Sequence, residues 1–225
     1  MHVDMQGDRH GGTGGFACVF LIPRLRAALK RALVGAEPTR PEPVLTLNQH
    51  KFWHDNGFLI LKGLIPQELI AAVNAEVESS GPIHLDSAVV RAALLSDRLV
   101  AILSELLHGA PLIVESLNLT SPPVPDNSVV TSICLEDVHP DAGPLFYYPG
   151  SHTIPPFTVE TEMSSCHTYL ASQIAARGLA KTAFVGVAGD VFLGHSHLLY
   201  GGLPARNSTR TRKSLLARYV QNKVG

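Results

Sequence analysis

The chain has 225 residues, 45% of them hydrophobic and 16% charged, which is typical of a folded globular protein and not of a disordered one. Its 18 lysines and arginines against 19 aspartates and glutamates give a formal net charge of -1, without the basic excess of nucleic-acid-binding proteins. The three cysteines form no disulfide framework or zinc motif and favour a reducing cytoplasm, and no apolar run reaches the roughly 18 residues of a transmembrane helix.

The first 44 residues are expected to form a flexible arm outside the folded domain. Residues 1–15 are rich in glycine, and residues 37–43 are rich in proline and predict a linker. Between them Leu25, Leu29 and Leu33 recur at helical spacing among basic residues, which predicts a short basic amphipathic helix. Such a helix either docks on its own domain or lies on a membrane or partner surface, and the sequence leaves both open.

The folded domain is predicted to run from residue 45 to 225 and to begin with helices. Thr46 is the expected N-cap of the first helix, and Gly57 is expected to end it. The predicted elements are a helix over 46–56, a strand over 58–61, a helix over 67–79 and a largely helical stretch over 87–107.

Short strands follow, separated by proline and glycine turns. They are predicted over 111–120, 129–138, 145–148, 182–187, 191–193 and 214–220, with a helical insertion over 160–178. Helices followed by many short strands indicate a mainly β protein with flanking helices. The pattern favours a double-stranded β-helix, the jelly roll of cupin-like proteins.

Three segments carry a resemblance to a known family. They are FWHDNGFLILKGLIP (residues 52–66), ICLEDVHPDAGPLFYYPGSHT (residues 133–153) and GDVFLGHSHLLYGGLPARNSTRTRKSLLARY (residues 189–219). Together they resemble the phytanoyl-CoA dioxygenase family of Fe(II)/2-oxoglutarate-dependent oxygenases from about residue 50 to 220. The resemblance implies the jelly roll and, as the ancestral reaction, hydroxylation of a small-molecule or lipid-like substrate.

The resemblance also implies where the cofactors would bind. In this family a His-x-Asp pair and a distal histidine hold iron, and an arginine pairs with the far carboxylate of 2-oxoglutarate. Arg212 matches that arginine, Ser214 follows it, and both are expected to line the co-substrate site with Tyr200. Tyr200, however, stands at the position of the distal histidine.

Both halves of the iron triad are therefore missing at their expected places. The loop that should carry the His-x-Asp pair, Ser121–Asn127, contains no histidine. A tyrosine is a poor replacement for the distal ligand, because its phenol has a pKa near 10 and is neutral at pH 7. We expect this chain to lack the usual Fe(II) site, while a site for 2-oxoglutarate remains open.

Other histidines offer alternative metal ligands. His195 and His197 would share one face of a strand, although the register with Tyr200 turns them away from the metal position. His139 and Asp141 form a literal His-x-Asp, but in a turn where Asp141 is an ordinary acceptor. His84 and Asp86 form a second His-x-Asp pair at the start of a predicted helix, where Asp86 or Ser87 would be the N-cap. His152 is expected to support the end of a strand.

Arg212 has two interpretations. On an inward strand it needs an anionic partner, which is either a ligand carboxylate or a protein acid such as Glu136 or Asp137.

The sequence leaves three hypotheses for the function. The chain is a divergent oxygenase with displaced iron ligands, a metal-free protein that binds a small acid or partners an active paralogue, or a metal-free isomerase or cyclase whose acid and base the sequence does not name.

Overall fold

The computed structural model describes residues 43–80, 87–114, 127–155, 163–207, 209–210 and 212–222. The chain divides into two units, Met1–Glu42 and Pro43–Gly225, and everything below concerns the second. The predicted N-terminal arm, the pair His84 and Asp86, and the loop residues 121–126 lie outside the described residues.

The helices begin and end close to their predicted bounds. They are α2 (Leu47–Asn56), α3 (Gln67–Ser80), α4 (Ala88–Leu94), α5 (Asp97–Leu107), α6 (Met163–Ala176) and the short 3-10 helix η1 (Ser151–Thr153). The side chain of Thr46 accepts the backbone N–H of Gln49, and Gly57 ends α2 with φ 75°, as predicted. Among the described residues, no helix is both long and apolar enough to span a membrane.

The predicted helical stretch 87–107 is two helices rather than one. Leu95 leaves the helix with φ -114° and ψ 25°, and Ser96 is extended with φ -59° and ψ 139°. Ser96 restarts the chain as the N-cap of α5, with Asp97 in the positive first turn. The break lets Leu94 and Leu99, from two helices, both become fully buried in one core.

The strands form two antiparallel sheets. They are β1 (Phe58–Leu61), β2 (Pro111–Val114), β3 (Ser128–Cys134), β4 (Leu145–Tyr147), β5 (Thr182–Phe184), β6 (Val191–His195), β7 (Tyr200–Gly202) and β8 (Ser214–Gln221). The five-stranded sheet has the order β1-β6-β3-β8-β2, and the three-stranded sheet has the order β5-β4-β7. Compared with the predictions, β3 and β5 end earlier and β6 continues to His195, while β7 was not predicted.

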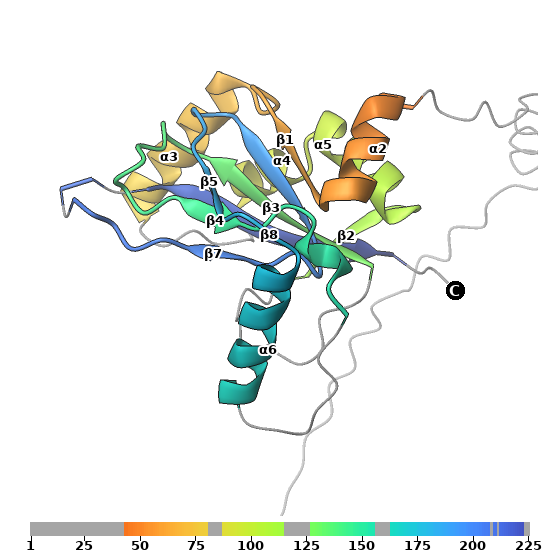
Figure 1. Cartoon of the computed structure of the whole chain (residues 1–225). Helices are drawn as coiled ribbons and strands as arrows, with labels where there is room; N and C mark the ends of the chain where they lie inside the picture. The colour runs from red at the N-terminus through yellow and green to blue at the C-terminus, as the bar shows by residue number, and fades with distance from the viewer. Residues whose placement is uncertain are drawn as a thin grey trace, which may run out of the picture. The chain divides into compact units, whose positions relative to one another are not determined.

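One hydrophobic core lies on the outer face of the five-stranded sheet, under the helices. Leu193 of β6, Ile133 of β3 and Tyr219 of β8 contribute to it, together with Leu99 and Leu103 of α5. Figure 1 shows helices α3, α4 and α5 on this side of the sheets and α6 on the opposite side. The hydroxyl of Tyr219 donates to the backbone oxygen of Leu94 at 2.7 Å and ties β8 to α4.

A second core lies between the two sheets, in the space called the barrel interior below. It is built from buried residues of both sheets and of two neighbouring loops: Phe58, Cys134, Val138, Leu145, Tyr147, Phe184, Phe192 and Leu198. Successive strand residues face opposite sides, so Phe192 enters the interior while its neighbours Val191 and Leu193 face the helices.

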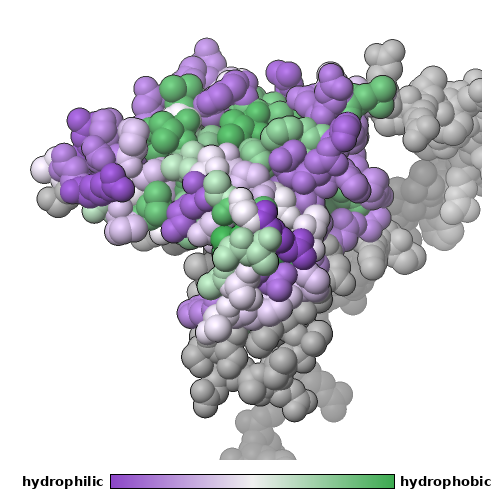
Figure 2. All heavy atoms as spheres, viewed as in Figure 1, coloured by the Kyte–Doolittle hydropathy of each residue, from purple (hydrophilic) through white to green (hydrophobic). Residues whose placement is uncertain are grey.

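Hydrophobic side chains also reach the surface. Figure 2 shows them among hydrophilic residues on the face viewed in Figure 1. The larger exposed ones include Leu47, Phe52, Leu112, Val185 and Val187. They come from α2, β2 and the segment that follows β5, and small numbers of exposed apolar residues are normal on protein surfaces.

Candidate functional site

Aromatic rings occupy the part of the barrel interior between β6 and the three-stranded sheet. We call Phe58, Tyr147, Phe184 and Phe192 the aromatic cluster. The ring of Tyr147 lies 4.5 Å from that of Phe58 and 5.0 Å from that of Phe192, measured between centroids. Phe184 completes the cluster at 5.6 Å from Phe192. All four side chains are buried, so they pack as a core in this half of the interior.

Tyr200 lies next to this cluster. It pairs with Tyr147 across β7 and β4, so both side chains point to the same side of the three-stranded sheet. Tyr200 is partly buried and packs against the second core. The position that the resemblance assigns to the distal histidine is thus held by an aromatic residue that contributes to packing.

The donor set of the described residues does not fit an iron triad. No group of three or more His, Cys, Asp or Glu side chains in the described part of the chain is arranged to hold a metal ion. In sequence, the loop Ser121–Asn127 that the resemblance assigns to the His-x-Asp pair contains no histidine, and neither do the residues 115–120 before it. A facial triad needs two imidazoles and a carboxylate, and neither imidazole is present at its expected place.

Arg212 approaches the barrel interior at the other end. It stands two residues before Ser214, which pairs with Cys134 of the second core, and its charge acts on the Cys134 thiol. The side chain is half-buried, and its buried Nη1 has no hydrogen-bond partner among the described residues. Burial lowers the pKa of the Arg212 guanidinium, which nevertheless keeps its charge at neutral pH.

The two acids considered as partners of Arg212 are bound to backbone groups instead. Glu136 accepts the backbone N–H of Lys213 at 2.7 Å, and Asp137 accepts that of Ala188 at 2.9 Å. Within the described ranges, Arg212 forms no ion pair with either carboxylate. The structure therefore gives no support to the internal ion pair, and the ligand interpretation stays open.

Asp190, predicted only as part of a turn, is a fully buried acidic residue. Its carboxylate accepts Lys62 Nζ at 2.7 Å and the backbone N–H groups of Gly63 and Val187 at 2.9 and 3.0 Å. Burial opposes the charge, but these three hydrogen bonds outweigh it and hold the pKa of the Asp190 carboxyl below its usual value. Asp190 joins the end of β1 to the start of β6 and is structural.

His195 and His197 lie away from Tyr200 and Arg212. His195 pairs with Val129, and both face the helix side of the five-stranded sheet. The strand ends at His195, so His197 lies in the following turn, and its N–H donates to His195 Nδ1 at 3.1 Å. The alternation with Tyr200 that the sequence analysis used does not apply, because β6 ends at His195 and Tyr200 lies on β7 of the other sheet.

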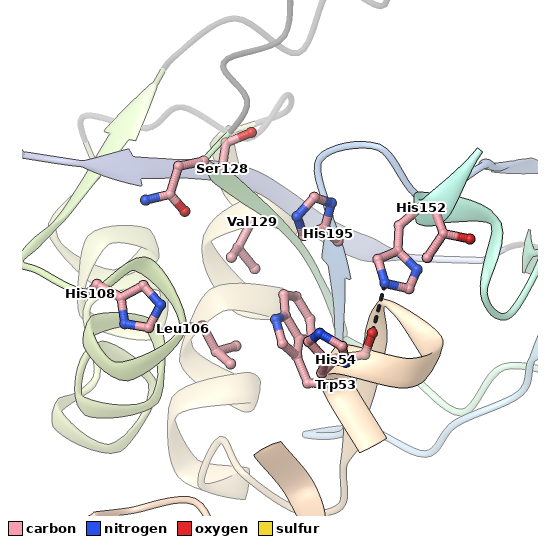
Figure 3. Close-up of a pocket in the computed structure, with 10 residues that line it drawn as sticks. Trp53, His54, Leu106, His108, Ser128, Val129, His152 and His195 are labelled. Carbon is pink, nitrogen blue, oxygen red and sulfur yellow. Dashed lines mark hydrogen bonds between the residues drawn. The ribbon is translucent and has the colours of Figure 1, made fainter. Parts of the chain in front are cut away.

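His195 instead lines a cavity of about 480 Å³ on that outer face. Figure 3 shows this histidine pocket, in which side chains from α2, α5, η1, β3 and β6 converge. Trp53, Leu106 and Val129 supply apolar surface, and His54, His108, His152 and His195 supply imidazoles. His152 Nε2 donates to the backbone oxygen of His54 at 3.0 Å, so His152 supports the end of α2.

The sequence did not predict this pocket, because its residues are distant along the chain and share no pattern. Burial, with the neighbouring His152 and His197, lowers the pKa of His195 to about 4. His195 is therefore neutral at pH 7. Since its Nδ1 accepts the His197 N–H, the ring proton lies on Nε2.

The lowered pKa of His195 predicts a loss of stability in mild acid. Because the pKa of His195 is lower in the folded protein than in the unfolded one, the unfolded state takes up the proton first as the pH falls. The folded state therefore keeps its full stability above pH 6.5 and loses part of it as the pH falls from about 6.5 towards 4. We expect the wild-type free energy of unfolding to fall by about 1–2 kcal/mol over this range, a value discounted for partial exposure. His195→Asn, which keeps an acceptor for the His197 N–H, should flatten this part of a urea-denaturation pH profile. An unchanged slope would contradict the assignment.

His139 and Asp141 form a solvated turn. His139 Nδ1 accepts the backbone N–H of Asp141 at 3.1 Å and lies 3.6 Å from its carboxylate, and both side chains are more than 40% exposed. The acceptor in this turn is therefore the His139 ring and not the Asp141 side chain that the sequence predicted. It brings no further ligand to the pair.

Comparisons with known proteins identify a family that matches part of the domain. Residues 104–214 match the family model of phytanoyl-CoA dioxygenase (PhyH). A search of curated proteins finds no match.

Solved structures share the fold. The chain is similar to the non-heme alpha-ketoglutarate-dependent carbocyclase SnoK from nogalamycin biosynthesis (16% identity, TM-score 0.60, covering 79% of this chain and 84% of that one). It is similar to EctD from S. alaskensis with bound Fe (18% identity, TM-score 0.60, covering 83% of this chain and 80% of that one). It is also similar to HygX from Streptomyces hygroscopicus with nickel, 2-oxoglutarate and hygromycin B bound (17% identity, TM-score 0.56, covering 80% of this chain and 88% of that one).

These likenesses confirm the predicted jelly roll, since the two antiparallel sheets and flanking helices superpose on oxygenases of that fold. Identities below 20% carry the fold and not the substrate. The family match covers the end of α5, the three-stranded sheet, part of the five-stranded sheet, and the positions of Tyr200 and Arg212. Residues 104–214 of the chain therefore match the phytanoyl-CoA dioxygenase (PhyH) family, as the resemblance predicted, on a fold that the chain shares with solved oxygenases.

Proposed function

We propose that this chain is a member of the family whose iron site has degenerated and that binds a small carboxylate in the barrel interior without metal. The observation that carries the proposal is the half-buried Arg212, whose Nη1 has no hydrogen-bond partner among the described residues. Removing a guanidinium from water is costly unless an anion pairs with it. A carboxylate matches the parallel N–H groups of arginine with two hydrogen bonds.

The family supports the choice of ligand. HygX, a structural neighbour, has been solved with 2-oxoglutarate bound, and Arg212 matches the co-substrate arginine in the resemblance. The iron half of the ancestral hydroxylation has no such support, because Tyr200 and the histidine-free segment 115–127 do not supply a triad. Iron chemistry is therefore no part of the proposed function. A partnership with an active paralogue stays a prediction.

The proposal predicts metal-independent stabilisation by 2-oxoglutarate. In buffer with excess EDTA, saturating 2-oxoglutarate should raise the Tm by roughly 5 °C, because a ligand that binds only the folded state stabilises it by mass action. Arg212→Gln should remove the shift. Arg210→Gln is the matched control, since Arg210 is exposed and two residues away, and its variant should respond as the wild type does.

Two results would contradict the proposal. One is the absence of any shift with 2-oxoglutarate in the wild-type protein. The other is a shift that survives in Arg212→Gln, which would place the ligand elsewhere. The Tm of each variant without ligand shows that it is folded before the comparison is made.

A further inference from the structure

The histidine pocket offers no fixed charge to a ligand. No Asp, Glu, Lys or Arg side chain is among the described residues that line it. Burial lowers the pKa of the His195 imidazole to about 4 and that of His152 below its usual value, so both rings are neutral at pH 7. A charged ligand that entered the pocket would lose its water without gaining an ion-pair partner in these two rings. The lining therefore favours an uncharged ligand.

Two N–H groups of the pocket have no hydrogen-bond acceptor. Because Nδ1 of His195 accepts the His197 N–H, its Nε2 carries the ring proton, and no described residue accepts that proton. The indole Nε1–H of Trp53 can only donate, and it too has no acceptor in the described part of the chain. The two rings lie 6.1 Å apart, measured between centroids, and Figure 3 shows them next to each other at the cavity. The pocket thus presents two donors to a ligand that brings acceptors.

Apolar surface lies beside these donors. Leu106 of α5 is 8% exposed and Val129 of β3 is 2% exposed, and both line the cavity together with the indole of Trp53. A planar ring packs well on such a surface, because aromatic rings stack on or meet one another at favourable angles. The volume of about 480 Å³ lies within the range of small-molecule sites, about 300–1,000 Å³. A compound built on one or two rings would fill it.

His108 lines the cavity from an unfavourable backbone conformation. It follows α5 with φ 55°, and no other non-glycine residue in the described ranges has a positive φ. Helix ends of this kind usually carry glycine, since a side chain raises the energy of the left-handed conformation. The exposed His108 ring makes no hydrogen bond with a described residue, and Figure 3 shows it across the cavity from His195. The imidazole therefore serves the cavity and not the helix end, and backbone strain of this kind gathers at binding sites.

We propose that the histidine pocket binds an uncharged planar ring compound that carries a carbonyl group, which accepts hydrogen bonds from the N–H groups of Trp53 and His195. The site goes beyond the proposed function and lies on the other face of the five-stranded sheet. Val129 and His195 face the helices, whereas the barrel interior lies between the two sheets. Ligands of the two sites therefore bind independently of each other.

The experiment uses the single tryptophan of the chain as its reporter. In isotope-labelled full-length protein the indole N–H of Trp53 gives one resonance in a proton–nitrogen correlation spectrum, and this group is one of the two donors. The probe is acetophenone. It is compared with toluene, which has the ring without the oxygen, and with benzoate, which has the ring and a negative charge. We expect a saturable downfield shift with acetophenone, and binding about tenfold tighter than that of toluene or benzoate.

Three variants separate the parts of the site. His195→Phe keeps a ring and removes the donor, so acetophenone should lose its advantage over toluene. His167→Phe is the matched control, since His167 is exposed on α6, and it should bind as the wild type does. His108→Gly should weaken acetophenone binding several-fold while its Tm is unchanged or higher, because glycine removes the ring and relieves the backbone.

Several outcomes would overturn the inference. The site is refuted if none of the probes shifts the indole resonance saturably, and the ligand class is refuted if toluene or benzoate binds as tightly as acetophenone. An acetophenone advantage that persists in folded His195→Phe, or a lower Tm with unchanged affinity in His108→Gly, contradicts the role of that residue. Arg212→Gln should leave acetophenone binding unchanged. If 2-oxoglutarate fails to bind while acetophenone binds, the proposed function falls and the histidine pocket stands.

Discussion

Replacing Asp190 with alanine is expected to lower the free energy of unfolding by about 3 kcal/mol and the Tm by roughly 10 °C. The carboxylate is 1% exposed and accepts hydrogen bonds from Lys62, Gly63 and Val187. Alanine would leave the backbone N–H groups of Gly63 and Val187 without this acceptor and Lys62 without its ion-pair partner. Urea denaturation followed by tryptophan fluorescence measures the change, since Trp53 packs against the core under the helices.

Lys62→Ala is the matched control for the same ion pair. Lys62 is 67% exposed, so its removal leaves Asp190 with both backbone donors and should cost about 1 kcal/mol or less. Because the pKa of Asp190 is lowered in the fold, its contribution is present above the unfolded value near 4 and is lost as the pH falls below it. Equal effects of the two substitutions would refute the role given to the buried carboxylate.

Replacing Phe192 with alanine is expected to cost about 3–5 kcal/mol. Phe192 is fully buried and its ring contacts Phe58, Tyr147 and Phe184, so it joins the two sheets across the interior. Removing the ring creates a cavity lined by apolar groups, which stays dry and binds small aromatic molecules. Saturating benzene should therefore recover part of the lost Tm in the variant and leave the wild type unchanged.

Phe146→Ala is the control in the adjacent sheet. Phe146 faces away from the interior, with Lys181 Nζ 4.6 Å from its ring centroid, and should cost about 1 kcal/mol when replaced. If Phe192→Ala costs no more than this, the space between the sheets is not a packed aromatic core. In that case the interior would have room for the ancestral iron site and its co-substrate together.

Local signals predicted most of the fold. The N-cap at Thr46 and the glycine stop at Gly57 are local, because the cap hydrogen bond and the positive φ depend on single residues. The break between α4 and α5 was missed, since the apolar spacing continues across Leu95 and Ser96 and only packing separates the helices. β7 was missed because two of its three residues are glycines, which carry no strand pattern.

The candidate site was predicted less completely. Arg212 and Tyr200 were selected from the family resemblance, and their roles stay predictions. The strand alternation used for His195 and His197 assumed one strand as far as Tyr200, whereas β6 ends at His195. The histidine pocket escaped prediction because Trp53, His152 and His195 meet only after the chain has folded.

The most direct test of the account is metal content and turnover after anaerobic reconstitution of the full chain with Fe(II) and 2-oxoglutarate. We predict iron well below one equivalent per chain after desalting, and no succinate released from 2-oxoglutarate when oxygen is admitted. Stoichiometric iron together with release of succinate would contradict the account. It would mean that other side chains have taken over the ligand positions that Tyr200 and the histidine-free segment leave unfilled.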